Sequence, residues 1–221
     1  MKYLIFDMDG VLVDNMAFHK RAWVSFSEKL GCPLTEETLA NVYGKTNRDT
    51  LAYLLKTELS DAEVERLSAE KEQHYRELFQ PFLNPVAGLE AFLKVASQQF
   101  ERLAIATSAP PANVDFVLDG LNIREYFHQI VDETMVSKGK PDPEIYLTSA
   151  RCLETSPDKC IVVEDSISGV KAAKGAEMAV VGMATTHTKD ELNPLVNWVV
   201  SDFNELLELL PVIQGKAPVT P

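Results

Sequence analysis

The sequence predicts an α/β fold in which a parallel sheet is interrupted by an all-helical insertion. Two observations support this prediction. Short apolar segments of strand length recur along the chain, and about ninety residues between the first and the second of them show helical periodicity without a convincing strand. The chain has 221 residues, 46% of them hydrophobic, which is enough to bury one core and a smaller second one.

Six apolar segments are expected to form the strands. Their residues do not alternate between apolar and polar types, so both faces of each strand should be buried, as in a parallel sheet. Helix-like segments separate the later strands, which predicts a Rossmann-like arrangement with helices packed against the sheet. The segments are residues 3–6, 103–106, 129–131, 160–163, 179–181 and 198–200.

The helical insertion divides the sheet domain into two stretches of sequence. Prolines between Gln80 and Pro85 resist continuation of a helix and mark the return of the chain to the sheet. Low apolar content and three prolines predict a frayed tail at the end. The expected boundaries are residues 1–14 and 82–210 for the sheet domain, 15–81 for the insertion and 211–221 for the tail.

Two helices of the insertion can be placed from the sequence. From Met16 to about Leu30, apolar residues follow the three- and four-residue spacing of one helix face. A later helix should begin at Ser60, because Ser60 and Glu63 have the spacing of a capping box, and it should end near Phe79.

The formal net charge of −12 disfavours nucleic acid as a partner, because phosphate backbones are bound by an excess of Lys and Arg. No apolar run approaches the roughly 20 residues that span a bilayer, and the first residues lack a secretion signal. Three widely separated cysteines without a C-x-x-C pair indicate neither a disulfide framework nor a zinc site. We therefore expect a soluble, cytoplasmic, monomeric protein that binds a small molecule.

Two aspartates, Asp7 and Asp9, directly follow the first predicted strand. Carboxylates placed together at the end of a buried strand repel each other unless a cation or a proton intervenes. Ligands bind at the carboxyl ends of the strands in open α/β sheets, so a functional site explains the pair better than a polar turn does.

Further polar residues follow later predicted strands or precede a helix. Each of them alone could be structural, as a helix cap or a solvated charge. Together they should converge on one edge of the sheet, where a lysine and a metal ion could attract an anionic substrate. They are Thr107, Ser108, Lys140, Glu164 and Asp165.

This ordered set of motifs resembles the haloacid dehalogenase (HAD) superfamily, in particular its β-phosphoglucomutase-like branch of phosphatases and phosphomutases with an inserted helical cap. The resemblance implies a HAD-like core, with residues 15–81 as the cap domain. It implies that Asp7 is the nucleophile and Asp9 the general acid and base. It further implies that phosphate is held by Thr107, Ser108 and Lys140, and a metal ion by Asp7, Asp9, Glu164 and Asp165.

Physical chemistry favours the same assignments. Mg²⁺ prefers hard oxygen ligands, which Asp7, Asp165 and the backbone carbonyl of Asp9 can supply. A dianionic phosphoryl group repels an attacking carboxylate, so positive charge from Mg²⁺ and Lys140 is needed. Asp9 can protonate the leaving alkoxide and later deprotonate water. Asp9 also argues against a dehalogenase, which has no such alkoxide to protonate; the resemblance implies that dehalogenases lack an aspartate at this position.

Four residues of the predicted cap are candidates for substrate binding. By the resemblance, His19 and Lys71 match positions where β-phosphoglucomutases carry a histidine and a lysine, which favours a sugar phosphate. The segment Gly44–Asp49 resembles the loop that selects the substrate. However, Asn47 stands where an arginine is expected, and Arg48 follows one place later. A one-residue shift rotates a helical side chain by about 100°, so Arg48 need not replace that arginine.

We expect a Mg²⁺-dependent phosphatase that hydrolyses a small phosphorylated metabolite, in the first place a sugar phosphate, through an aspartyl phosphate on Asp7. Two alternatives remain open. One is a β-phosphoglucomutase, which passes the phosphoryl group to a second sugar hydroxyl. The other is a non-catalytic binding module on the same fold, which should have lost a core acid or the lysine, and the sequence retains all of them.

Overall fold

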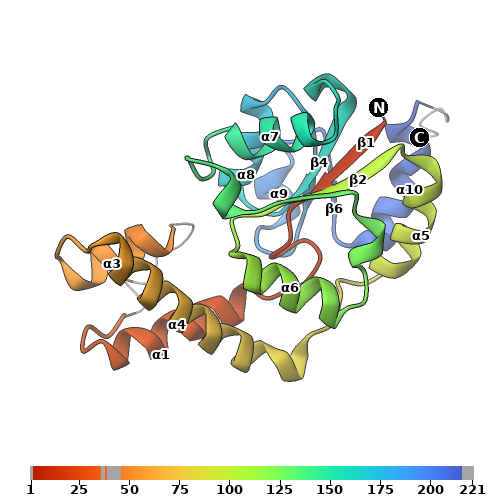
Figure 1. The fold of residues 1–221 in the computed structure, drawn as a ribbon. Helices are drawn as coiled ribbons and strands as arrows, with labels where there is room; N and C mark the ends of the chain where they lie inside the picture. Colours follow the sequence, from red (N-terminus) through yellow and green to blue (C-terminus); the bar gives the residue numbers. More distant parts are fainter. Residues whose placement is uncertain (1, 36–37, 39–45, 216–221) are drawn as a thin grey trace. The chain divides into compact units, whose positions relative to one another are not determined.

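The computed structural model describes residues 2–35, 38 and 46–215. The chain divides into two compact units, one formed by Met1–Asp14 with Asn84–Pro221 and the other by Asn15–Leu83 (Figure 1). The insertion expected from the sequence ended at residue 81. The smaller unit ends two residues later, because it includes the short 3₁₀ helix η1 (Gln80–Phe82).

The larger unit is built on a six-stranded sheet with the order β3-β2-β1-β4-β5-β6, in which every pair of neighbours is parallel. This confirms the predicted fold class. All six predicted strands form, and β2, β4 and β5 extend beyond the expected segments. The strands are β1 (Tyr3–Phe6), β2 (Arg102–Ala106), β3 (Gln129–Val131), β4 (Cys160–Glu164), β5 (Ala179–Met183) and β6 (Trp198–Val200).

Helices cover both faces of the sheet, with α5 and α10 on one face and α7 and α8 on the other (Figure 1). The helices of this unit are α5 (Leu89–Gln99), α6 (Pro111–Gly120), α7 (Glu144–Cys152), α8 (Ile167–Gly175), α9 (Lys189–Leu192) and α10 (Phe203–Ile213). Three 3₁₀ helices lie between them: η2 (Arg124–Tyr126), η3 (Glu133–Met135) and η4 (Pro157–Lys159).

The alternation of side chains along β1 explains why a continuous apolar run is needed. Phe6 contacts the rings of Phe92 from α5 and Phe203 from α10, with centroids 6.1 and 6.2 Å away. Its neighbour Ile5 belongs instead to the cluster that includes Tyr146 from α7 and Ala173 from α8, on the other face. The two apolar clusters, one on each face of the sheet, thus meet at the central strand.

The last helix corrects the expected start of the tail. The prediction placed the tail from residue 211, since Pro211 lacks an N–H and disfavours a helix interior. Helix α10 nevertheless continues through Pro211 to Ile213, because its apolar face, which includes Leu206, Leu210 and Ile213, is buried.

The smaller unit contains α1 (Met16–Lys29), α3 (Asn47–Leu55) and α4 (Asp61–Phe79), followed by η1. Its core is formed by apolar residues of these helices, among them Trp23, Leu51 and Leu67. The capping box at Ser60 is present, since Ser60 accepts from the N–H of Glu63 and the Glu63 carboxylate accepts from the N–H of Ser60. None of the helices in the described ranges combines the length and the apolar character that crossing a bilayer requires.

The register of the central strands fixes where the candidate residues lie. Phe6 pairs with Ile105 of β2 and with Val163 of β4, so these three strands end at one level. The next backbone amide, that of Asp7, donates to the carbonyl oxygen of Val163 at 3.0 Å. The residues after β1, β2 and β4 therefore emerge at the same edge of the sheet.

Candidate active site

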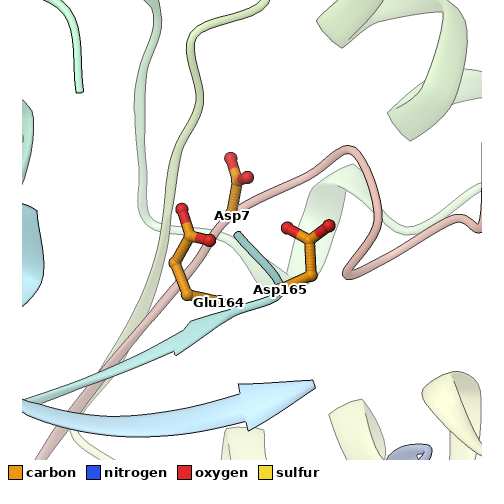
Figure 2. A group of neighbouring side chains, drawn as sticks. All are labelled: Asp7, Glu164 and Asp165. Atoms are coloured by element: carbon orange, nitrogen blue, oxygen red, sulfur yellow. The ribbon is translucent and has the colours of Figure 1, made fainter. Parts of the chain in front are cut away.

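Three carboxylates meet at this edge of the sheet. Asp7 follows β1, and Glu164 and Asp165 lie at the end of β4. Figure 2 shows their side chains pointing to the same side, beyond the ends of the strands. One oxygen from each of the three lies within 4.8 Å of the others, which is close enough to share one cation.

Asp7 lies beside a buried lysine. Its side-chain Oδ1 is 3.1 Å from Nζ of Lys140, and the residue is only 8% exposed. Burial raises the pKa of Asp7 to about 7, and the charges of Glu164 and Asp9 add to this, while Lys140 opposes the rise. The carboxylate is therefore poorly hydrated, which makes it a stronger nucleophile than an exposed aspartate once it is ionised.

Lys140 bridges Asp7 and Glu164. Its Nζ lies 2.6 Å from Oε1 of Glu164 and donates to the carbonyl oxygen of Ala106 at 3.3 Å. Burial alone would lower the pKa of Lys140, but the two carboxylates outweigh it and hold the pKa well above the ordinary value. Lys140 is therefore a permanent positive charge at the site.

Glu164 is completely buried and receives four donors. Its Oε1 accepts from Lys140 and from the hydroxyl of Tyr146 at 3.0 Å, and its Oε2 accepts from the N–H and hydroxyl of Ser166 at 2.8 and 3.0 Å. Burial acts to raise the pKa of Glu164, but Lys140 and these donors lower it below the ordinary value. These bonds occupy all the lone-pair directions of the carboxylate, so Glu164 primarily anchors Lys140.

Helix α8 can approach Glu164 only because residue 169 is a glycine. A Cβ built on Gly169 would lie 1.6 Å from Oε1 of Glu164, far inside any allowed contact. Gly10, in the loop after β1, has the same relation to Asp165: a Cβ there would lie 2.0 Å from Oδ2. Gly10 also has a φ of +75°, which favours glycine.

Asp165 is 2% exposed and accepts a hydrogen bond from the hydroxyl of Thr186, which lies beyond β5. Burial raises the pKa of Asp165 well above its ordinary value, and the negative charges of Glu164 and Asp7 add to the rise. Among the described residues, its side chain has no ion pair with a lysine or arginine.

The donor set fits a divalent metal ion. Three buried carboxylates meet here, and in the described part of the chain a single ammonium, that of Lys140, pairs with two of them, Asp7 and Glu164. The remaining negative charge is costly to bury without a further cation. Oxygen donors of this kind are the ligands that Mg²⁺ prefers.

The remaining core candidates lie at or next to this cluster. Asp9 is partly buried, and its charge acts on Asp7. Thr107 is buried just beyond β2, and its hydroxyl accepts from the N–H of Ala109 at 3.1 Å. Ser108, next to it, is exposed. The close contacts therefore join Asp7, Lys140, Glu164 and Asp165, while Thr107 and Ser108 form the adjacent turn.

In the smaller unit, three of the four cap candidates gather around Glu72. Lys71 is 2% exposed and pairs with Glu72 at 2.8 Å, and its Nζ lies 3.2 Å from Nδ1 of His19. The Asn47 amide donates to the same Glu72 oxygen at 3.0 Å. Arg48 is instead exposed and pairs with Asp61 at 2.6 Å.

The first two residues of the predicted specificity loop, Gly44 and Lys45, lie outside the described residues. Sequence reasoning did not single out Glu72, Tyr146 or Thr186. Each contacts a candidate residue, but only Glu72, as the direct neighbour of Lys71, carried a signal in the sequence.

Comparison with known proteins identifies similar chains. The family of haloacid dehalogenase-like hydrolases matches residues 4–183. The chain is 33% identical over 189 residues to the β-phosphoglucomutase of Bacillus subtilis, with 83% of each chain covered. It is 35% identical over 177 residues to the phosphorylated carbohydrates phosphatase of Thermotoga maritima, covering 80% of this chain and 82% of the relative.

The fold is also similar to solved structures. A family IA, variant 3 HAD hydrolase from Entamoeba histolytica superposes with a TM-score of 0.88 at 29% identity, covering 97% of this chain and 100% of the other. The β-phosphoglucomutase of Clostridium difficile gives a TM-score of 0.82, also at 29% identity, with 98% and 96% covered.

Proposed function

Because this chain belongs to the haloacid dehalogenase-like hydrolases, we propose that it is a Mg²⁺-dependent phosphatase acting through an aspartyl phosphate on Asp7. The observation that carries the proposal is the convergence of the buried Asp7, Lys140 and Asp165 at one edge of the sheet. A nucleophile, a fixed positive charge and an oxygen-rich cation site are what transfer of a phosphoryl group requires.

In the first step, an ionised oxygen of Asp7 attacks phosphorus, and the bond from phosphorus to the ester oxygen breaks. Lys140 is held against Asp7 by Glu164, so its ammonium is already in place to attract the phosphoryl oxygens. The N–H of Ser108, in the turn that leads into α6, is proposed as a further donor to phosphate.

Asp9 is proposed to move the protons. It gives a proton to the leaving oxygen as the ester bond breaks, and then takes one from the water that attacks the phosphorus of the aspartyl phosphate. The second attack breaks the bond between phosphorus and Asp7, releases inorganic phosphate and restores the carboxylate. The partial exposure of Asp9 leaves it accessible to substrate and water.

Asp7, Asp165 and the backbone carbonyl of Asp9 would hold the metal ion. When bound, Mg²⁺ would offset the repulsion between the Asp7 carboxylate and the anionic phosphoryl group. Glu164, whose oxygens are taken up by Lys140, Tyr146 and Ser166, contributes mainly its charge.

The substrate is proposed to be a small sugar phosphate. The names of the B. subtilis and T. maritima relatives support this class, since both refer to phosphorylated carbohydrates. In the smaller unit, the proposed cap, His19, Asn47 and Lys71 are proposed to select the substrate. The net charge of −12 supports a small-molecule partner rather than nucleic acid, and we propose a cytoplasmic monomer.

Purified protein should release inorganic phosphate from at least one sugar phosphate when Mg²⁺ is present, and excess EDTA should abolish the release. The reason is that, without a metal ion, Lys140 alone does not offset the negative charge of the three carboxylates, and this charge repels an anionic phosphate ester. A panel of phosphorylated sugars, assayed for phosphate release, tests this. Release that persists unchanged in EDTA and is not restored by Mg²⁺ would contradict the metal requirement.

A mutase is the second candidate, favoured by the 33% identity to the β-phosphoglucomutase of B. subtilis. The protein should be given β-glucose 1-phosphate with a trace of β-glucose 1,6-bisphosphate. A phosphatase is expected to release phosphate in step with substrate loss. Formation of glucose 6-phosphate without stoichiometric phosphate would instead identify a mutase, because water would then not be the acceptor.

A non-catalytic binding module would release no phosphate from any compound in the panel. Retention of Asp7, Asp9, Lys140 and Asp165 argues against that third reading.

A further inference from the structure

The loop between β5 and α9 brings two neighbouring threonines to the site. It is fixed at both ends: the N–H of Ala184 donates to the carbonyl of Val200 at 2.8 Å, and Thr188 caps α9 in a capping box with Glu191. Thr185 and Thr186 lie between these two anchors, and both are partly buried.

Thr186 holds one of the proposed metal ligands. Its hydroxyl donates to Oδ2 of Asp165, a carboxylate that is almost fully buried. Glu164, the neighbouring acid, has four donors, whereas among the described residues the hydrogen bond to the side chain of Asp165 comes from Thr186. The orientation of Asp165 therefore depends on this hydroxyl more than the orientation of Glu164 depends on any single donor.

Thr185 holds the loop that carries Asp7 and Asp9. Its hydroxyl donates to the carbonyl oxygen of Gly10. Gly10 directly follows Asp9, whose backbone carbonyl is a proposed ligand, and its Cα packs against the carboxylate of Asp165. The two threonines lie in a turn, since the N–H of Thr185 donates to the carbonyl oxygen of Met183 at 3.0 Å, and their hydroxyls reach two different partners, the backbone of Gly10 and the side chain of Asp165.

We propose that Thr185 and Thr186 are positioning residues that hold the backbone after Asp9 and the side chain of Asp165 in the geometry that binds the metal ion. The inference rests on the proposed function only in that the bound group is a divalent cation. Hydrogen bonds to metal ligands fix the orientation of those ligands, and losing one typically weakens metal binding by about 10- to 100-fold.

The test measures metal binding directly, with Mn²⁺ as the probe and electron paramagnetic resonance of free Mn²⁺ as the readout. Thr186→Val keeps the shape of the side chain but removes the donor, and it should raise the dissociation constant about 10-fold or more. Thr186→Ser keeps the hydroxyl and should remain within about twofold of the unchanged protein. Thr185→Val should weaken binding in the same direction.

Thr188→Val is the matched control. Thr188 lies in the same loop, but its hydroxyl bonds to Glu191 and not to the site, so Mn²⁺ affinity should be unchanged. Thermal melts of all variants, together with Thr186→Ala as a second way to remove the hydroxyl, separate positioning from general loss of fold. In phosphatase assays the Mg²⁺ concentration for half-maximal rate should rise, while kcat at saturating Mg²⁺ should recover substantially.

The proposal is overturned if folded Thr186→Val and Thr186→Ala bind Mn²⁺ as tightly as the unchanged protein, or if Thr188→Val weakens binding equally. If the unchanged protein itself binds no Mn²⁺, the metal site of the proposed function fails as well. Tight binding by all variants, with normal phosphatase activity, would reject the role of the threonines alone.

Discussion

Asp7→Asn is expected to abolish phosphate release while the protein remains folded. The amide keeps the size of the carboxylate but cannot attack phosphorus, so turnover should fall by roughly 10⁴-fold or more, as for other catalytic nucleophiles. Asp7 is buried beside two other carboxylates, and burial raises its pKa to about 7. Removing its charge should therefore not lower the free energy of unfolding of the metal-free protein, which urea denaturation can measure.

The control for this experiment is Asp14→Asn. Asp14 is exposed and follows the same loop, so its substitution should leave phosphate release within about twofold of the unchanged protein. A fully active Asp7→Asn protein would show that Asp7 is not the nucleophile. Phosphate release should be measured with the best substrate from the sugar phosphate panel.

Lys140→Met is expected to damage both activity and stability. It removes the ammonium shared by Asp7 and Glu164 and leaves two buried carboxylates without that partner. Breaking a buried ion pair from one side typically destabilises a protein by about 3–5 kcal/mol. Loss of the positive charge near the phosphoryl oxygens should lower kcat by about 10²- to 10³-fold.

A second substitution separates the two effects. In Lys140→Met/Glu164→Gln the buried charge that was left behind is neutralised, so much of the lost free energy of unfolding should return. Activity should not return, because the phosphoryl oxygens still lack the ammonium. If the double variant is no more stable than the single one, Glu164 is not the group that Lys140 neutralises.

The strands and the core of the site were predictable because their signals are local. Continuous apolar runs predicted β1 and β4, and the capping box predicted the start of α4. Polar residues that directly follow parallel strands must emerge at one edge of the sheet. The sequence therefore predicts that Asp7 and Asp165 lie close together, as they do.

Other features depend on contacts between distant residues. Thr186 reaches Asp165 across 21 positions, and no spacing rule connects a threonine after one strand with an acid after another. The continuation of α10 through Pro211 depends on burial of its apolar face, which outweighs the local preference of proline. Arg48, a candidate from the sequence alone, instead pairs with Asp61 at the surface.

The place of β1 in the sheet bears on how the enzyme is made. Tyr3 pairs with Arg102 on one side and with Cys160 on the other, so the strand that precedes Asp7 gains its second neighbour only after β4, in the last third of the chain, has been synthesised. Until then one edge of β1 has no partner strand, and closing such long loops slows folding. The carboxylates of Asp7 and Asp165 can therefore meet only late in synthesis, and a growing chain that ends before β4 is expected to release no phosphate from a phosphate ester.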